Sequence, residues 1–345
     1  MTATTTAARP TYPALRLLQQ FLHARETGIL VALIVVIVAT TAVNPSFLFS
    51  SDGFRDLLLT PSILILLAVG QAVVIITRNV DLSVGSVVGL TAYLTGRLFI
   101  DVPGISIGVV FLAGLGLGAL LGLVNGALVA FGKVPALVIT LGTLYAYRGI
   151  NVVWTGSNRI NSSDMPQAFL GLGTNTFLFI PYLTIIALLV TLAAGWYLRN
   201  KRGGREMYAI GSDPDAAELY GLTVKRSLLV AFVLCGALSG LAGVLFAARY
   251  GTTNSQTGTG LELQAVGAAV IGGVAIFGGS GTVYGAAIGA ILLLTINRAL
   301  PILGIQDFWQ QAVVGILIIG AIVLDRVLAV RLSKRLVSER QASHD

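Results

Sequence analysis

Between Ile105 and Phe131 the chain reads ISIGVVFLAGLGLGALLGLVNGALVAF, a run without a single acidic or basic residue. Such a run is typical of a helix that crosses a lipid bilayer, because about 20 apolar residues span the hydrocarbon core. Similar runs recur along the 345 residues, of which 55% are hydrophobic and only 11% are charged. Since these runs lack the alternation of barrel strands, the sequence predicts an all-α, polytopic membrane helical bundle.

The apolar runs predict about ten transmembrane helices, an even count that places both termini on one side of the membrane. The expected ranges are 28–44, 62–77, 83–100, 105–131, 136–154, 177–198, 227–249, 262–277, 281–299 and 308–330. Most of the 22 Lys and Arg residues then fall in the tails and in alternate loops. By the positive-inside rule these segments are cytoplasmic, so 1–27 and 331–345 are expected as cytoplasmic tails around a transmembrane domain, 28–330.

One polar, charged stretch interrupts the apolar pattern. From Arg205 to Gly221 it reads REMYAIGSDPDAAELYG, and basic residues such as Arg202 and Lys225 flank it. Its pattern is that of a short amphipathic helix with loop flanks, whereas most loops between membrane helices need no particular composition. We therefore expect residues 203–222 to form a cytoplasmic segment that contacts another protein.

Two glycine ladders predict close packing between helices. Small residues that recur every four positions on one helix face allow backbones to approach closely in lipid. The predicted packing residues are Gly114, Gly118, Gly122 and Gly126 in the fourth run, and Gly281, Gly285 and Gly289 in the ninth.

The turn between the second and third runs reads TRNVDLSVGS, from Thr77 to Ser86. Asp81 and Ser83 suit an N-cap of the following helix, and Arg78 is close enough to pair with Asp81. The alternative is a break within the membrane whose polar atoms line a pore or anchor a moving element, because charge is costly there. The sequence leaves both interpretations open.

A row of hydroxyl groups marks the fifth run. On a helix, Thr140, Thr143 and Tyr147 share one face, and Arg148 lies toward the outer end of the same run. Neutral polar groups beside aromatic rings suit an uncharged polyol better than an ion. The alternative is structural, because threonine hydroxyls also bond back to their own helix.

Two polar loops are expected on the outer side, at 155–176 and 251–263. The first suits a docking surface, a lid or a solvated connector. The second, GTTNSQTGTGLEL, is rich in hydroxyl and amide groups, and its chemistry alone does not separate a gate from a connector.

Patterns for catalysis and for metal binding are missing from the sequence. It contains no Ser/His/Asp set, no HExxH motif and no nucleotide-binding loop. The one cysteine, Cys235, has apolar neighbours and is expected as a packed small hydrophobe, while His23 and His344 lie in the tails. We therefore expect no catalytic residue, no metal and no cofactor on this chain. Its net charge of +7 follows from membrane topology and needs no nucleic acid.

Several motifs together, in the same order, resemble the permease subunits of bacterial sugar-importing ABC transporters of the ribose, xylose and autoinducer-2 kind. The motifs are Asp81–Ser86, Thr140–Tyr145 with Arg148 and Gly149, Gly204–Gly221, and Gly272–Gly281 with Gly285 and Gly289. The resemblance covers nearly the whole chain and implies a multi-pass permease domain, 28–330, in the bacterial inner membrane. It further implies a cytoplasmic ABC ATPase that holds ATP and Mg²⁺, a second permease copy or paralogue, and an extracytoplasmic sugar-binding protein.

The resemblance also implies roles for individual residues. Segment 203–222 would be the coupling segment, which sits in a groove of the ATPase. The ATPase-coupling residues would be Gly204, Arg205, Tyr208, Ile210, Gly211, Asp213, Ala216, Ala217 and Gly221. The substrate pathway would include Asp81, Ser83, Asn125, Thr140, Thr143, Tyr147 and Arg148.

Two details bear on the solute. Arg78-Asn79-Val80 before Asp81, and the later run Gln256–Glu262, look more like the autoinducer-2 and rhamnose importer permeases than the ribose type. Rhamnose or autoinducer-2 is therefore favoured, with ribose and xylose next. The alternatives are a gradient-driven secondary sugar transporter, which would need coupled acids in the membrane, and an ABC permease for nucleosides or branched-chain amino acids.

Overall fold

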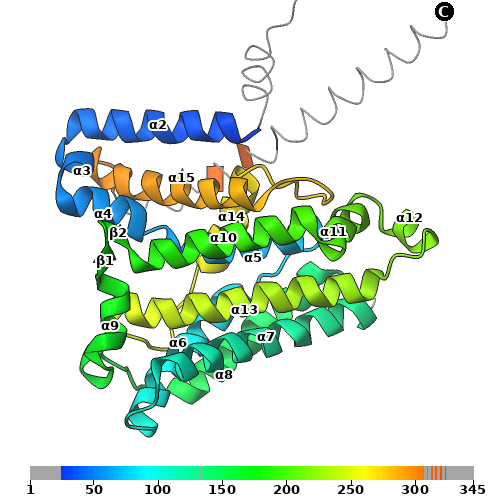
Figure 1. The fold of residues 1–345 in the computed structure, drawn as a ribbon, viewed down its shortest axis with the longest axis horizontal. Helices are drawn as coiled ribbons and strands as arrows, with labels where there is room; N and C mark the ends of the chain where they lie inside the picture. The colour runs from blue at the N-terminus through cyan, green and yellow to red at the C-terminus, as the bar shows by residue number, and fades with distance from the viewer. Residues whose placement is uncertain are drawn as a thin grey trace, which may run out of the picture.

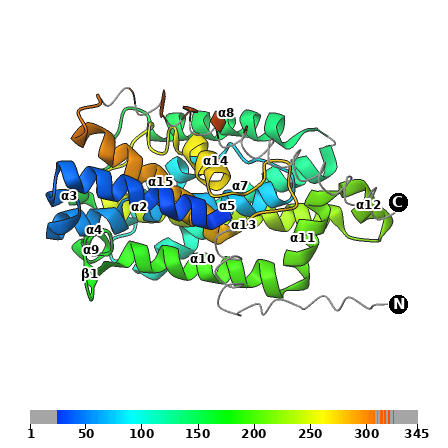
Figure 2. The same ribbon diagram turned by 90° about the horizontal axis from the view of Figure 1, so that it is seen from above.

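The computed structural model describes residues 25–132 and 134–306, together with 309, 312–313, 315–316, 319–320 and 323. Over this part of the chain the long helices run side by side as a bundle (Figure 1). A small hairpin and several short helices gather at one end, and α11 (Arg202–Ser212) and α12 (Pro214–Leu219) extend from the other (Figures 1 and 2).

The long helices are α2 (Arg25–Val43), α5 (Ser62–Ile76), α6 (Val84–Asp101), α7 (Ile107–Gly132), α8 (Ala136–Thr155), α10 (Tyr182–Asn200), α13 (Val224–Tyr250) and α15 (Val283–Ile302). The other helices are α3 (Ser46–Phe49), α4 (Ser51–Leu59), α9 (Gln167–Thr174), α14 (Leu261–Ile271) and a 3-10 turn, η1 (Ser162–Asp164). Strands β1 (Thr176–Phe177) and β2 (Ile180–Pro181) pair antiparallel.

Within the described residues, 6 helices are long and apolar enough to cross a membrane. They are Ser51–Ile76, Ile107–Gly132, Ala136–Thr155, Tyr182–Asn200, Val224–Tyr250 and Val283–Ile302. The prediction of a helical membrane bundle is therefore confirmed. The tenth expected span, 308–330, lies largely outside the described residues, as do most of tail 1–27 and all of tail 331–345.

The expected spans 28–44 and 83–100 form α2 and α6, which are not among these six helices, and two further expected spans differ from the structure in their bounds. Helix α10 begins at Tyr182, not near 177, because residues 176–181 form the β1–β2 hairpin. The eighth expected span, 262–277, contains only the 11 residues of α14. At a rise of about 1.5 Å per residue this helix covers about half of the hydrocarbon core, so it cannot cross the membrane alone. It ends at Ile271, and Gly273, with a φ of 84°, turns the chain out of the helix.

The first glycine ladder lies where α7 packs on α13. A Cβ on Gly118 would collide with the carbonyl oxygen of Gly236, and one on Gly122 would collide with that of Phe232. Helix α13 contributes glycines to the same contact, since a Cβ on Gly236 would collide with the carbonyl of Gly118. The two backbones are therefore in direct contact, at a separation that only glycine allows. The α7 residues in this contact are Gly114, Gly118, Gly122 and Gly126.

The second ladder is shorter than the sequence predicted. Gly285 and Gly289 pack α15 on α14, where a Cβ would collide with the carbonyls of Gly272 and Ala268 respectively. Gly281 is not part of this helix face, because the helix begins at Val283. Its φ of 120° instead makes it a turn residue in a conformation that favours glycine.

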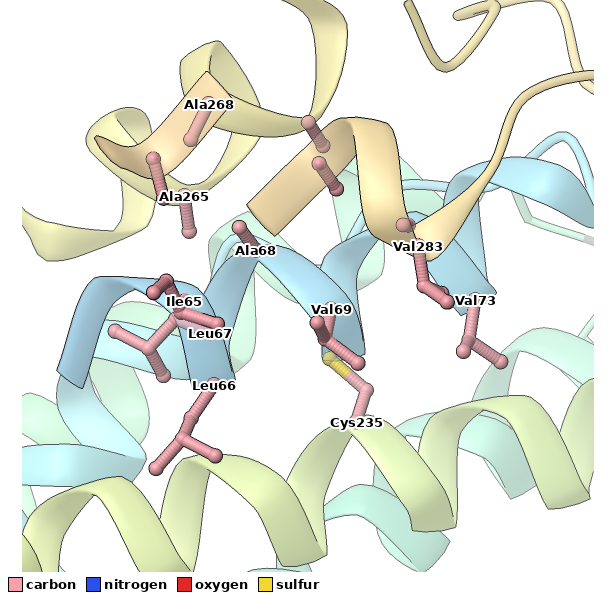
Figure 3. Packing of buried hydrophobic residues seen from close by; sticks show 14 of the residues in the cluster. Ile65, Leu66, Leu67, Ala68, Val69, Val73, Cys235, Ala265, Ala268 and Val283 are labelled. Atoms are coloured by element: carbon pink, nitrogen blue, oxygen red, sulfur yellow. The ribbon is translucent and has the colours of Figure 1, made fainter. Parts of the chain in front are cut away.

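Helix α5 forms the centre of the core. Every residue from Ser62 to Ile76 is buried, which agrees with a helix that is apolar on all sides. Figure 3 shows α14 close to the middle of α5, with Ala265 and Ala268 near Ala68. On another side of α5, Cys235 of α13 is a packed core residue, as its apolar neighbours predict.

The backbone contact between α7 and α13 predicts a position-specific cost for side chains. We expect Gly118→Leu to lower the thermal unfolding midpoint of the purified protein strongly, because overpacking costs about 1–3 kcal/mol or more. Gly116→Leu is the matched control, since nothing lies within 4 Å of its Cβ position. Circular dichroism during heating in detergent measures both. Equal midpoints for the two variants would contradict the close contact.

Candidate functional site

The polar stretch predicted to contact another protein folds into α11 and α12, with a change of direction at Asp213. Helix α11 buries Met207, Ile210 and Gly211, three positions that share one helix face, together with Gly204 near its start. Arg205 lies on the exposed side and donates from Nη1 to the carbonyl of Asn200 (3.0 Å). One face of α11 is therefore fixed to the bundle while the other remains accessible.

Helix α12 is a short, capped projection. Its first residue is Pro214, and Asp213 Oδ1 accepts hydrogen bonds from the backbone N–H groups of Asp215 (3.1 Å) and Ala216 (3.0 Å). Ala217 is its buried residue and Gly221 follows it with a φ of 78°.

Two large side chains at the end of α12 are exposed, although the sequence analysis did not select them. Leu219 is 90% exposed and Tyr220 is 87% exposed. A leucine and a tyrosine side by side at the end of a polar segment are typical of a contact with another protein. The signal was present in the sequence, since they are the large hydrophobic residues among the charges of α12.

Helix α11 rests on the turns that connect the membrane helices. A Cβ on Gly211 would collide with the Ile76 carbonyl at the end of α5, and this carbonyl also accepts from Gly279 N–H (3.0 Å). Tyr208 donates from its hydroxyl to the Gly281 carbonyl (2.9 Å). Burial raises the pKa of Tyr208, which keeps the hydroxyl protonated as a donor. The segment thus touches the α5–α6 turn and the α14–α15 turn at once.

The α5–α6 turn begins with an unusual residue for its backbone conformation. Helix α5 ends with bonds from Arg78 N–H to the Ile75 carbonyl (2.8 Å) and from Asn79 N–H to the Val74 carbonyl (3.2 Å). This is the Schellman pattern, in which glycine usually takes the left-handed position, yet Arg78 occupies it with a φ of 67°. The predicted pairing of Arg78 with Asp81 is wrong, because the Arg78 side chain is exposed while Asp81 is buried.

Three residues beyond Arg78, Asp81 forms the centre of a buried polar cluster. Its Oδ1 accepts from Ser83 N–H (2.9 Å), from the Ser83 hydroxyl (2.7 Å) and from Asn125 Nδ2 (3.3 Å). Asn125 Nδ2 also donates to Ser83 Oγ (2.7 Å). Ser83 therefore does not cap α6 with its side chain as predicted. Its hydroxyl oxygen accepts from Asn125, and its backbone N–H donates to the Asp81 carboxylate.

Gln71 completes this cluster from the middle of α5. With its amide oriented to satisfy both groups, it donates to the Asp81 carbonyl and accepts from Asp81 N–H, each at 3.1 Å. The sequence analysis missed Gln71. The signal was available, because an amide within an otherwise apolar buried helix requires a partner.

The hydroxyl row on α8 joins the same cluster. The Tyr147 hydroxyl lies within hydrogen-bond distance of Asn125 Oδ1 (3.2 Å) and of the Leu121 carbonyl (3.1 Å). Thr140 donates to the Val80 carbonyl (3.1 Å), next to Asp81, whereas Thr143 bonds back to its own helix. These groups tie α7 and α8 to the α5–α6 turn. In this conformation, the polar atoms of the cluster satisfy one another.

Arg148 lies apart from the Asp81 cluster and holds the loop that precedes α14. Its Nη1 donates to the Thr257 carbonyl (2.8 Å), and one turn further along α8 the Asn151 Nδ2 donates to the Ser255 carbonyl (3.3 Å). Asn151 is another residue that the sequence analysis did not select. The predicted pathway residues are therefore divided between two places, the Asp81 cluster and the contact of α8 with the 251–260 loop.

The described part of the chain is a helical membrane bundle with a polar segment seated on the turns between its spans, an arrangement that fits a transport permease. Comparison with protein families agrees, because the family model described as "Branched-chain amino acid transport system / permease component" matches residues 53–322. The chain belongs to this permease family. Membership of the family and the six apolar helices make it a multi-pass protein of the inner membrane.

Characterised relatives carry a more specific name. The chain is 37% identical over 308 residues to the autoinducer 2 import system permease protein LsrC of Enterobacter sp. (strain 638), covering 89% of this chain and 88% of that protein. It is 38% identical over 318 residues to LsrC of Salmonella typhimurium (strain LT2), covering 92% of this chain and 90% of that protein. No solved structure matches the chain.

The Asp81 cluster predicts a stability difference between two of its members. Asn125→Leu removes the donor that Asp81 and Ser83 share and places an apolar side chain among buried polar atoms, which costs about 1–3 kcal/mol. Tyr147→Phe removes one hydroxyl and should cost less. We expect a clearly larger fall in the thermal unfolding midpoint for Asn125→Leu, measured in detergent by tryptophan fluorescence. The reverse order would show that Asn125 is not the centre of the network.

Proposed function

We propose that this chain is the transmembrane subunit of an ATP-driven importer for autoinducer-2 or a similar sugar-like solute. The observation that carries the proposal is the double contact of α11 with the α5–α6 and α14–α15 turns, through Gly211 and Tyr208. A segment that touches both turns is suited to convert a push from a cytoplasmic partner into movement of the membrane helices.

The partner in this proposal is a cytoplasmic ABC ATPase that binds α11 and α12. The sequence contains no nucleotide-binding loop, so ATP and Mg²⁺ belong to that ATPase. The exposed pair Leu219 and Tyr220 supports the docking role, since large apolar and aromatic side chains exposed among polar residues are typical of interfaces. A second permease copy or paralogue and an extracytoplasmic solute-binding protein complete the assembly.

The topology that we propose has about ten spans, with both termini and segment 203–222 in the cytoplasm. Its support is the position of α11 and α12 at one end of the bundle and of the β1–β2 hairpin at the other (Figure 2). The basic residues around α11, among them Arg199, Lys201 and Arg202, suit the cytoplasmic side.

Within this topology the Asp81 cluster is the element that moves with the coupling segment. Gly211 touches the Ile76 carbonyl, and only a short turn separates Ile76 from Asp81. The bonds of Asp81 to Gln71, Ser83 and Asn125 then carry a displacement of this turn to α6 and α7. On this view the predicted pathway residues Asp81, Ser83, Asn125, Thr140, Thr143 and Tyr147 control the pathway by positioning its helices.

The choice of solute rests on the relatives and on chemistry. The LsrC relatives are named as autoinducer 2 import permeases. The family description names branched-chain amino acids, which makes such an amino acid the second candidate. The buried hydroxyl and amide groups on α8 favour a neutral, hydroxyl-rich solute over a zwitterion. Uptake of autoinducer-2, rhamnose, ribose and isoleucine by cells that express the complete system distinguishes these candidates.

The exposed pair on α12 gives a test of docking. We expect the double variant Leu219→Asp, Tyr220→Asp to lose most of the ATPase that copurifies with the wild-type protein, because two charges replace an apolar anchor. Leu178→Asp, at the exposed tip of the opposite hairpin, is the control and should retain the ATPase. Quantitative mass spectrometry of the detergent-purified complex gives the ratio. Full retention by the double variant would contradict docking through α12.

The contact of Gly211 with Ile76 gives a test of coupling. We expect Gly211→Ala to bind the ATPase normally but to lower ATP-dependent uptake about tenfold or more, because its Cβ forces α11 away from the turn. Gly203→Ala, on the same helix, meets only the mobile end of Tyr197 and serves as the control. Uptake and ATP hydrolysis are measured together in proteoliposomes. Normal uptake by Gly211→Ala would refute this route of coupling.

A further inference from the structure

The 251–260 loop and the start of α14 enclose polar atoms that have no partner. Among the described residues, Asn151 Oδ1, Thr253 Oγ1 and Glu262 Oε2 are buried and make no hydrogen bond. Asn151 as a whole is 0% exposed and Thr253 is 1% exposed. Each such atom costs about 1–3 kcal/mol, and native proteins retain few of them. The Asp81 cluster, whose members satisfy one another, differs in this respect.

Two of these three residues, Glu262 and Asn151, lie against one face of α6. A Cβ on Gly85 would collide with Glu262 Oε2, and a Cβ on Gly89 would lie 3.0 Å from Asn151 Nδ2. Further along, Ile160 lies 2.8 Å from the Cβ position of Gly96 and forms a β-bridge with Thr253. The glycines of α6 therefore provide a shallow surface, along which lie Glu262, Asn151 and Ile160, the bridge partner of Thr253.

The location is within the membrane-spanning part of the bundle. Helix α14 lies beside the middle of α5, where Ala265 and Ala268 approach Ala68 (Figure 3). The loop before α14 therefore enters the bundle as irregular backbone, which is tolerated at such depth only where protein covers it or where it lines a polar cavity. Broken helices that start in mid-membrane form solute sites in transporters for the same reason.

The donors and acceptors of the site suit a ligand with several hydroxyl groups. Asn151 Oδ1 and Glu262 Oε2 are pure acceptors, and Thr253 Oγ1 both donates and accepts. Arg148 adds a donor that now bonds the Thr257 carbonyl of the covering loop. Several acceptors, one hydroxyl and one guanidinium match a molecule with several hydroxyl groups, in which each hydroxyl donates once and accepts elsewhere.

We propose that Arg148, Asn151 and Glu262 form the intramembrane binding site for an uncharged, polyhydroxylated solute, and that residues 251–260 cover this site in the present conformation and contribute Thr253 to it. The proposal rests on the proposed transport function and adds to it the solute contacts. Two bonds hold the cover closed, from Arg148 to the Thr257 carbonyl and from Asn151 to the Ser255 carbonyl. The same two side chains bind the solute once the loop moves.

Transport by variants tests the contacts. In proteoliposomes with the ATPase and the binding protein, we expect Glu262→Gln and Thr253→Val to lower autoinducer-2 uptake about tenfold or more, with ATPase copurification unchanged. Thr95→Val is the matched control and should stay within about twofold, since Thr95 is a buried threonine of α6 that bonds its own helix. Wild-type rates for Glu262→Gln and Thr253→Val would overturn the site.

Cysteine labelling tests the site independently of uptake. The chain has one cysteine, the buried Cys235, so Cys235→Ala provides a background for Thr253→Cys and for the control Thr95→Cys. We expect a small hydrophilic thiol reagent to modify Thr253→Cys in one nucleotide state of the complex, and autoinducer-2 to slow this reaction about tenfold, while Thr95→Cys stays unmodified. Mass spectrometry of this chain measures the modified fraction.

The outcomes of the two experiments are separable. No labelling of Thr253→Cys in any nucleotide state would overturn the cover and the site together. Protection by isoleucine but not by autoinducer-2 would overturn the polyol assignment. Absence of autoinducer-2 uptake by the wild-type complex would count against the proposed function, whereas the labelling of Thr253→Cys still decides whether the loop opens.

Discussion

Direct contact between backbones, made possible by glycine, is the constraint on which the rest of this bundle depends. Helices α7 and α13 meet through Gly118 and Gly236, and α14 and α15 meet through Gly272 and Gly285. In lipid, apolar side chains gain little by leaving the bilayer for a helix interface, so close van der Waals packing must hold helices together. These contacts fix the scaffold against which the shorter elements, α11 and α14, are positioned.

The same kind of backbone contact occurs where α11 meets the bundle. Gly211 of α11 lies on the Ile76 carbonyl, and Gly278 and Gly279 of the α14–α15 turn complete the contact around Arg78 and Ser212. At Gly211 the contact is between backbones, so little of it can absorb a displacement. A push on α11 would therefore pass to the two turns with little loss, because packed backbones shift as units and do not deform gradually.

Polar groups within the bundle fall into two classes with different physical consequences. Around Asp81 the donors and acceptors of Gln71, Ser83 and Asn125 satisfy one another, which rigidifies the start of α6. Beside the 251–260 loop, Asn151 and Glu262 retain acceptor atoms without partners. A satisfied network stabilises one arrangement, whereas unsatisfied atoms favour any state that supplies donors. The first suits an anchor and the second suits a binding site.

The sequence by itself determined the membrane-helix class, the polar segment at 203–222 and the candidate packing positions, because these follow from local composition and from a spacing that a helix converts into a face. It selected Asp81, Asn125 and Tyr147. It gave no means to see that they meet one another and Gln71, since the contacts join the α5–α6 turn to three different helices, α5, α7 and α8. Tertiary structure alone decided that α14 stops after 11 residues, that Gly281 is a turn residue bonded to Tyr208, and that Asn151 and Glu262 face α6. The physical reason is that apolar periodicity reports burial along one helix, whereas the partner of a buried polar atom depends on which other helix lies against it.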